Sequence, residues 1–216
     1  MRLDKNMIGR PMVIPKILWT TWLGETPPDL VKRCIETQQK CAQDFGYEHR
    51  ILDNDYASNF NGYVEECLIR KDVKGYVKAS DWLRCYALLE EGGIYIDADM
   101  EILPGKNFDH LLNYKMFVPK DPQGHFGNAG FGAEVGHPLL KHYLDRISDN
   151  FKGEGELVYE PGIRAFSDMF YISDISEIKI LTPDYFFPYN HQTGKEEITP
   201  NTLVKHYYLD SWIDKR

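Results

Sequence analysis

Two aspartates, one residue apart, stand directly after an apolar run in the stretch GGIYIDADMEIL, residues 92–103. They are Asp97 and Asp99, and Ile94 and Ile96 lead into them. Carboxylates rarely follow a buried run unless a cation or a hydrogen-bond donor pairs with them. In an extended strand, residues i and i+2 point to the same side, so we expect both carboxylates to converge on one point. Oxygen ligands of this kind suit Mg²⁺ or Mn²⁺, which often complete their shells with substrate phosphates.

A second pair of charged residues, Asp81 and Arg84, lies three residues apart in ASDWLRCYALLEEGG, residues 79–93. This segment is the clearest predicted helix, because Ser80 is a good N-cap, Asp81 suits the positive helix end, and two glycines stop the helix. Side chains at this spacing share one helix face. The spacing alone leaves open whether the two residues form an ordinary surface ion pair or part of a binding site.

The elements that position these residues alternate along the chain. Strand, helix, strand, helix and strand in that order predict an α/β fold: a mixed, mainly parallel sheet with helices on both faces. Ligands bind at the carboxyl ends of strands in such sheets, and the two aspartates fall at such an end. Strands are predicted over 14–22, 47–53, 94–99, 116–121 and 130–135, with late strands or loops over 179–190 and 202–212. Helices are predicted over 29–45, 55–74 with an interruption near Asn61-Gly62, 79–93, 137–151 and 161–170.

Length and charge narrow the class of protein. A chain of 216 residues suits one domain, and we expect a tail over 1–12 and a domain over 13–216. The net charge of −8 argues against nonspecific nucleic-acid binding, which needs a basic face. The four cysteines form no Cys-x-x-Cys pair, so buried free thiols in a reducing compartment are expected rather than a zinc site.

The sequence contains no apolar run of membrane-spanning length and no signal peptide before the first predicted strand. We therefore expect a cytoplasmic protein. Peripheral association with the inner face of the plasma membrane is left open.

Four motifs, in order along the chain, resemble glycosyltransferases of the family 32 type, whose sugar-binding region contains an Asp-x-Asp motif. This group includes yeast-type α-mannosyltransferases and bacterial capsular polysaccharide glycosyltransferases, and the clostridial glucosylating toxins carry a similar stretch. The matching stretches are IPKILWTTWLG, ASDWLRCYALLEEGGIYIDADMEIL, GNAGFGAEVGHP and VKHYYLDSW, which together run from about residue 14 to 212. The resemblance implies a GT-A fold, a nucleotide-diphosphate sugar donor, a divalent cation that is usually Mn²⁺, and a retaining reaction.

The resemblance also implies roles for single residues. Asp97, Asp99 and His206 would hold the metal, and Asp81 and Arg84 would contact the donor's hydroxyls and its sugar or diphosphate. Trp22 would stack on the uracil base, and Trp19 stands where the family usually has His. The predicted nucleotide-sugar-binding set is Thr20, Thr21, Trp22, Ser80, Asp81, Arg84, Tyr95, Asp97, Ala98, Asn128, Ser211 and Trp212, and the catalytic set is Asp97, Asp99, Arg84 and Asp81.

Plainer interpretations accompany these roles. Trp22 and Tyr95 could be core residues, Asn128 a turn former and His206 a surface histidine. No residue stands out as a general base, although Glu160 and Asp168 are candidates, so front-face attack assisted by the leaving phosphate is expected. The predicted function is transfer of a hexose, with a UDP-sugar as the expected donor, to a glycan or lipid-linked sugar in capsular or surface polysaccharide synthesis. The alternatives are a metal-dependent nucleotide-sugar hydrolase and a non-catalytic sugar-nucleotide-binding module.

Overall fold

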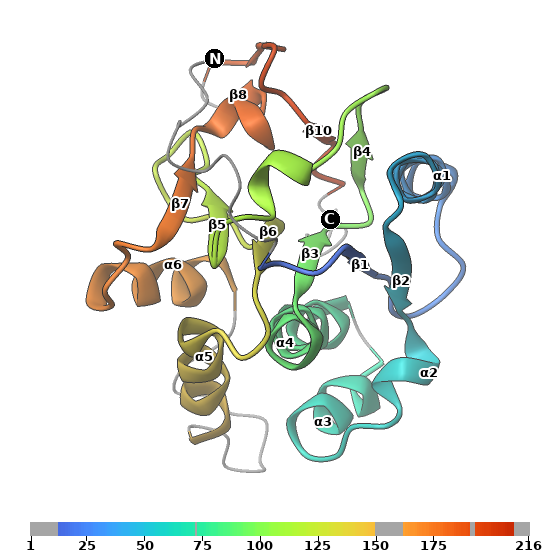
Figure 1. Cartoon of the computed structure of the whole chain (residues 1–216). Helices are drawn as coiled ribbons and strands as arrows, with labels where there is room; N and C mark the ends of the chain where they lie inside the picture. The colour runs from blue at the N-terminus through green and yellow to red at the C-terminus, as the bar shows by residue number, and fades with distance from the viewer. Residues whose placement is uncertain (1–12, 72, 150–161, 191–192, 210–216) are drawn as a thin grey trace.

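A six-stranded mixed sheet forms the centre of the molecule (Figure 1), in a computed structural model that describes residues 13–71, 73–149, 162–190 and 193–209. Its strands are β1 (Ile17–Thr21), β2 (Glu48–Leu52), β3 (Gly93–Ile96), β5 (Met116–Pro119), β6 (Gly130–Ala133) and β7 (Ile178–Leu181). They are arranged in the order β2-β1-β3-β6-β5-β7. The pairs β1–β2, β1–β3 and β5–β7 are parallel, and β6 runs antiparallel to both its neighbours.

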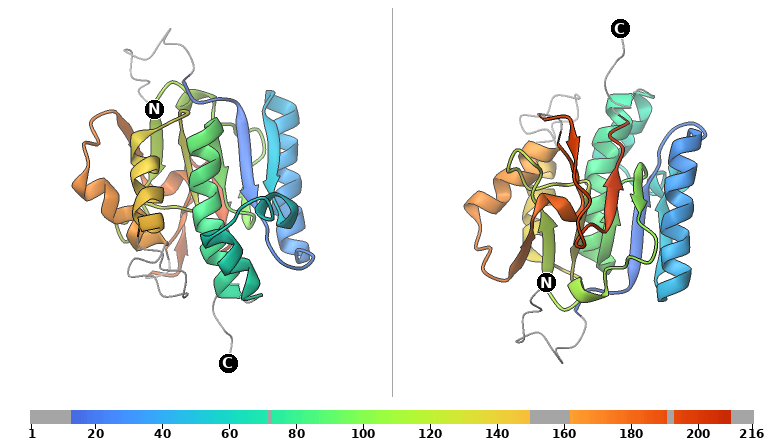
Figure 2. Two further views of the ribbon diagram at one scale, coloured as in Figure 1. Left: turned by 90° about the horizontal axis from the view of Figure 1, so that it is seen from below. Right: turned by 90° about the horizontal axis from the view of Figure 1, so that it is seen from above.

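Helices cover both faces of this sheet, as the sequence predicted (Figure 2). They are α1 (Asp29–Phe45), α2 (Asn54–Ala57), α3 (Tyr63–Ile69), α4 (Val73–Glu91), α5 (Pro138–Asp149) and α6 (Ile163–Ile172). Helix α4 packs against α3, α5 and β1, whereas α1 packs against β2 and the strand that follows β3. None of the helices in the described part of the chain is both long enough and apolar enough to span a membrane.

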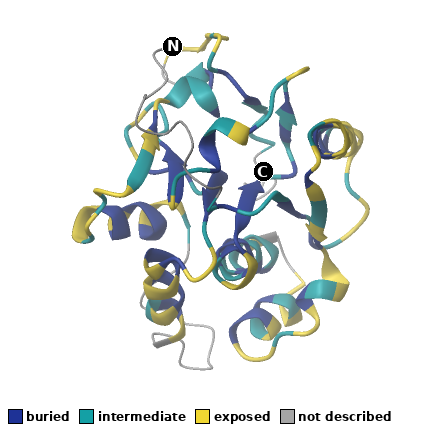
Figure 3. Cartoon of the chain, viewed as in Figure 1, coloured by how far each residue is buried: buried dark blue, intermediate teal, exposed yellow. Residues whose placement is uncertain are grey.

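Alternation along the strands divides the core into two halves. Trp19 and Tyr95 point to the side of α4, where they pack with apolar residues of α4, α5 and α6. Leu18 and Ile94 point to the opposite side and pack with residues of α1 and of the segments after β3. Strands β3, β5 and β6 are buried along their whole length (Figure 3), so the sheet itself is a rigid support.

Two small strand pairs stand apart from the main sheet. Strand β8 (Tyr189–Asn190) pairs with β9 (Lys195–Glu196), and β4 (Met100–Ile102) pairs with β10 (Val204–His206). The β4–β10 ladder is antiparallel and sets His206 opposite Met100. It therefore brings the end of the described chain beside the turn that carries the two aspartates.

The predicted start of the second long helix is wrong. Helix α4 begins at Val73, so Ser80 lies in its interior and Asp81 is not at the positive helix end. Nothing between Val73 and Ser80 prevents helix formation, and packing against α3 stabilises this first part. The predicted end is right: Gly92 has φ 66 and its N–H donates to the Leu88 carbonyl, 3.0 Å away.

The aspartate pair does not lie in an extended strand, contrary to expectation. Strand β3 ends at Ile96, and residues 97–99 form a tight turn before β4. The Met100 N–H donates to the Asp97 carbonyl over 3.0 Å and closes this turn. The two carboxylates therefore converge because the chain turns back after β3, and not because of strand alternation.

Candidate metal and nucleotide-sugar site

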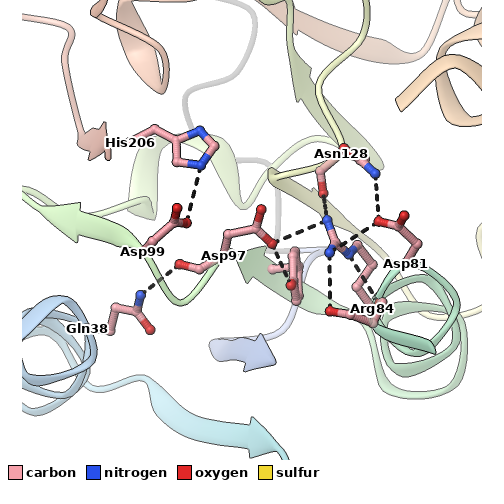
Figure 4. Close-up of polar contacts among 9 residues, drawn as sticks. Gln38, Asp81, Arg84, Asp97, Asp99, Asn128 and His206 are labelled. Carbon is pink, nitrogen blue, oxygen red and sulfur yellow. Dashed lines mark hydrogen bonds and ion pairs between the residues drawn. The ribbon is translucent and has the colours of Figure 1, made fainter. Parts of the chain in front are cut away.

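Three side chains that can ligate a metal meet at the carboxyl end of β3 (Figure 4). Asp97 and Asp99 come from the turn after β3, and His206 comes from β10. One ligand atom from each of the three lies within 4.8 Å of the others. The cluster is the one group of three such residues found among the described parts of the chain.

The donor set fits Mn²⁺ or Mg²⁺. Nε2 of His206 lies 3.2 Å from Oδ1 of Asp99; this direct contact has a length close to the ~3 Å that separates adjacent ligands of an octahedral ion with bonds of about 2.1 Å. Oδ2 of Asp99 accepts from the Leu209 N–H, which fixes the rotation of this carboxylate. Two carboxylates and an imidazole are borderline-to-hard ligands, and a set of three leaves shell positions for phosphate oxygens.

Arg84 connects the metal cluster to the second charged pair. Its guanidinium lies 3.3 Å from Oδ1 of Asp97 and 3.2 Å from Oδ1 of Asp81, and all three side chains are largely buried. The guanidinium also donates to the carbonyls of Ser80 and Asn128 and to the Ser80 hydroxyl. Arg84 is therefore held by a fixed set of acceptors, in the manner that its planar fork allows and a lysine does not.

Three carboxylates lie close together at the site with one guanidinium. Arg84 contacts Asp81 and Asp97, and Asp99 lies against His206 instead. Burial raises the pKa of Asp81 to about 6, although Arg84 opposes the shift. Burial also raises the pKa of Asp97, again against Arg84. Burial would raise the pKa of Asp99 too, but hydrogen bonds from His206 and the Leu209 amide outweigh it and lower that pKa. A divalent cation would relieve this repulsion.

Asn128 is hydrogen-bonded to both members of the Asp81–Arg84 pair. Its Nδ2 donates to Oδ1 of Asp81 over 2.9 Å, and its carbonyl accepts from Arg84 over 2.8 Å. At the preceding Gly127, a Cβ would lie 2.6 Å from the ring of Phe187. That glycine is therefore required by aromatic packing. Asn128 itself holds the Asp81–Arg84 pair in place through its two hydrogen bonds.

Trp22 lies beside the aspartate turn, half-buried, at the end of β1. It packs against the buried cluster of Val31, Ile35 and Ala98, and its indole N–H donates to the Glu25 carbonyl. Ala98 is itself buried in this contact. Trp19, by contrast, is a core residue whose indole N–H donates to the Gly92 carbonyl.

The structure buries three other residues of the predicted binding set. Thr20 is fully buried within β1, and Thr21 is nearly so. Tyr95 is also fully buried; its hydroxyl donates to Oδ1 of Asp97 over 2.7 Å, so it orients the carboxylate. Asp168 is exposed on α6. Ser211, Trp212 and Glu160 lie outside the described residues, so their predicted roles stay predictions.

Gln38 is a buried polar residue at the site that the sequence analysis missed. It belongs to α1 and its side-chain amide donates to the carbonyls of Asp97 and Met100. A signal for it was present in the sequence, because Gln38 falls on the apolar stripe of the helix between Cys34 and Cys41. A polar residue on a buried stripe needs a partner, and here the partner is the metal-site turn.

The fold of this chain is the GT-A fold, a known class of glycosyltransferase fold. The PaToxG glycosyltransferase superposes with a TM-score of 0.55 at 21% identity, over 74% of this chain and 68% of that chain. The chain itself belongs to the family described as capsular polysaccharide synthesis protein, whose model matches residues 5–131. The matched segment includes Asp81, Arg84, Asp97, Asp99 and Asn128 and ends before His206.

Two curated relatives are similar over much of the chain. An uncharacterized glycosyltransferase, L373, of Acanthamoeba polyphaga mimivirus is 24% identical over 93% of this chain and 84% of its own length. Inositol phosphoceramide mannosyltransferase 2 of Schizosaccharomyces pombe is 29% identical over 70% of this chain, which spans 44% of the yeast protein. These findings confirm the resemblance to family 32-type glycosyltransferases and the expected fold class.

Proposed function

We propose that this chain is a metal-dependent, retaining glycosyltransferase that moves a hexose from a nucleotide-diphosphate sugar, a UDP-sugar by preference, to a hydroxyl of a glycan or lipid-linked saccharide. The observation that carries the proposal is the convergence of Asp97, Asp99 and His206 at the carboxyl edge of the sheet. Membership of a capsular polysaccharide synthesis family supports a role in capsular or surface polysaccharide synthesis.

In this proposal, Asp97, Asp99 and His206 hold the cation, which supplies a Lewis acid against the charge that develops on the leaving diphosphate. Arg84 points a fixed guanidinium at the same region, where it favours negative charge on the phosphates or on the donor sugar. Asp81 accepts hydrogen bonds from donor hydroxyls, and Trp22 offers an aromatic face to the base. These groups are pre-positioned by buried hydrogen bonds, so little reorganisation accompanies donor binding.

The leaving phosphate is the proposed acceptor of the proton from the attacking hydroxyl. The carboxylates of Asp81, Asp97 and Asp99 are engaged with Arg84 or with the metal cluster, which leaves none of them for an acceptor on the opposite side of the sugar. If the hydroxyl attacks from the face that the diphosphate leaves, the phosphate oxygen can take the proton and configuration is retained.

The test is incubation of the protein with a panel of UDP- and GDP-sugars, with and without glycan acceptors, in Mn²⁺ and in excess EDTA. A glycosyltransferase consumes donor and forms a glycosidic product only when acceptor and cation are both present. Donor consumption that is the same without any acceptor would favour a hydrolase. Donor binding without consumption under every condition would favour a non-catalytic binding module.

A further inference from the structure

Gln38 fastens helix α1 to the turn that carries the two aspartates. Its side chain is fully buried. Nε2 donates to the Asp97 carbonyl over 3.1 Å and to the Met100 carbonyl over 3.0 Å. The amide nitrogen has two protons and faces two carbonyls, so both donors are satisfied by the same turn. Figure 4 shows Gln38 on the opposite side of this turn from Arg84.

The other end of the same amide faces a second residue. Oε1 of Gln38 lies 3.4 Å from Nε2 of His49, a partly buried residue of β2. With the Nε2–H tautomer, His49 donates to this oxygen and favours the amide orientation that directs the NH₂ group to the turn. Burial lowers the pKa of His49, which keeps the imidazole neutral.

Backbone hydrogen bonds from other elements also hold this turn: the Asp97 N–H donates to the Ala129 carbonyl over 2.8 Å, and the Asp99 carbonyl accepts from the Tyr207 N–H over 3.1 Å. The turn's carbonyls at Asp97 and Met100 bracket the two candidate metal-ligating carboxylates, and the Met100 N–H already uses the Asp97 carbonyl. The Asp97 carbonyl therefore accepts from two donors, the Met100 N–H and Gln38. A buried carbonyl with two donors is fixed in orientation, and this also fixes the peptide plane next to the side chain. Rotation of either peptide would separate the carboxylates of Asp97 and Asp99.

We propose that Gln38 is a positioning residue for the cation site: it fixes the Asp97–Met100 turn in the conformation that points both carboxylates at one ion, with His49 holding its amide. The inference rests on the proposed function for the identity of the ion. Gln38 acts through the turn and does not ligate the metal itself.

The experiment compares Gln38→Met, which keeps the length and loses both donors, with Gln39→Met, an exposed neighbour on the same helix. Mn²⁺ binding in the presence of saturating UDP is followed by electron paramagnetic resonance, and hydrogen exchange of peptides covering 97–102 is followed without metal. We expect the Mn²⁺ dissociation constant of Gln38→Met to rise about tenfold or more, as for other residues that orient metal ligands. Exchange in 97–102 should be faster in Gln38→Met and unchanged in Gln39→Met.

A second variant tests whether the amide must reach both carbonyls. Gln38→Asn keeps a buried amide, but its shorter side chain cannot reach both carbonyls, so it should weaken Mn²⁺ binding in the same direction. His49→Leu should do so to a smaller extent. Wild-type affinity and wild-type exchange in both Gln38 variants would overturn the positioning role, whereas a wild-type protein that binds no Mn²⁺ with UDP would overturn the proposed function. The exchange experiment still decides the role of Gln38 at the turn in that case.

Discussion

Nη1 of Arg84 lies 3.3 Å from Oδ1 of Asp97; the Arg84 side chain is buried, whereas Asp97 is partly exposed. Asp97, the first residue of the Asp-x-Asp motif, thus contacts the Arg84 guanidinium on α4 and also belongs to the candidate cation site. The same guanidinium reaches Asp81, so the two pairs of charged residues found in the sequence form one network.

Arg84→Leu should destabilise the fold strongly, because it leaves Asp81 and Asp97 buried without their cationic partner. Breaking a buried pair by removing one member typically costs about 3–5 kcal/mol. Urea unfolding measures the loss. Lys141→Leu, which breaks the exposed Lys141–Asp145 pair, is the control and should cost less than about 1 kcal/mol. Equal losses in the two variants would contradict the buried network.

Asp99→Asn should abolish Mn²⁺ binding in the presence of UDP and stop donor turnover, while leaving the fold intact. The substituted side chain has the same shape and still offers an oxygen to the Leu209 N–H, but it lacks the charge that a divalent cation requires. Mn²⁺ titration, a donor-consumption assay and circular dichroism test the three parts. Asp145→Asn on the exposed face of α5 is the matched control. Full turnover of the wild-type protein in excess chelator would refute metal dependence.

Trp22→Ala should weaken UDP binding by about 1–3 kcal/mol, the range for stacking of a base on an aromatic side chain. Quenching of tryptophan fluorescence by UDP reports binding, and the titration is repeated in Trp212→Phe to remove a second reporter. Trp22→Phe keeps an aromatic face and should retain most of the affinity. If UDP affinity is unchanged in Trp22→Ala, the packing of Trp22 against Val31, Ile35 and Ala98 is its whole role.

The Asp81 carboxyl should make stability depend on pH in a defined direction. Its pKa is raised to about 6 in the folded protein from 3.8, chiefly by burial. The folded state therefore binds more protons than the unfolded state between these values, and the contribution of Asp81 to stability falls as pH rises from about 4 through 6. The unfolding free energy of Asp81→Asn, relative to wild type, should rise over this interval and level off above it. Urea unfolding at several pH values gives the difference, and a flat difference would show that Asp81 titrates normally.

Retention of configuration is the stereochemical prediction. An α-linked donor should give an α-linked product, because an inverting reaction needs a general base on the far side of the sugar and the carboxylates of the site are engaged with Arg84 or the metal cluster. Proton NMR of the anomeric signal in the first-formed product decides it. A β-linked product would make Glu160 and the exposed Asp168 the first residues to mutate.

Much of the sheet and the first long helix could be predicted from local patterns. The apolar stripe of α1 and the left-handed Gly46 after it define Asp29–Phe45, the same bounds that the sequence suggested. The start of α4 could not be found this way, because Ser80 is a favourable N-cap by type and only packing against α3 extends the helix back to Val73. Local preference for a cap was overridden by tertiary contacts.

Some residues of the candidate site could likewise be predicted from the sequence, and others could not. Asp97 and Asp99 were evident from an apolar run that ends in two carboxylates, and Asp81 and Arg84 from their helical spacing. No local pattern places His206 beside Asp99, because this contact depends on the pairing of β10 with β4, which lies about a hundred residues earlier in the chain. The prediction of His206 as a metal ligand came from the family resemblance. Gln38 was missed because the apolar stripe of α1 was considered only for its apolar members.

The short pairing of β4 with β10 allows part of the candidate metal site to open locally. This ladder shares no strand with the six-stranded sheet, so β10 can detach without breaking any of the hydrogen bonds of that sheet. Such a local opening costs less free energy than global unfolding. Detachment would carry His206 away and would also remove the Tyr207 and Leu209 N–H groups that donate to Asp99, whereas Asp97 stays held by Arg84 and Tyr95. One candidate ligand, Asp97, therefore belongs to the rigid scaffold, and the other two depend on a separable segment.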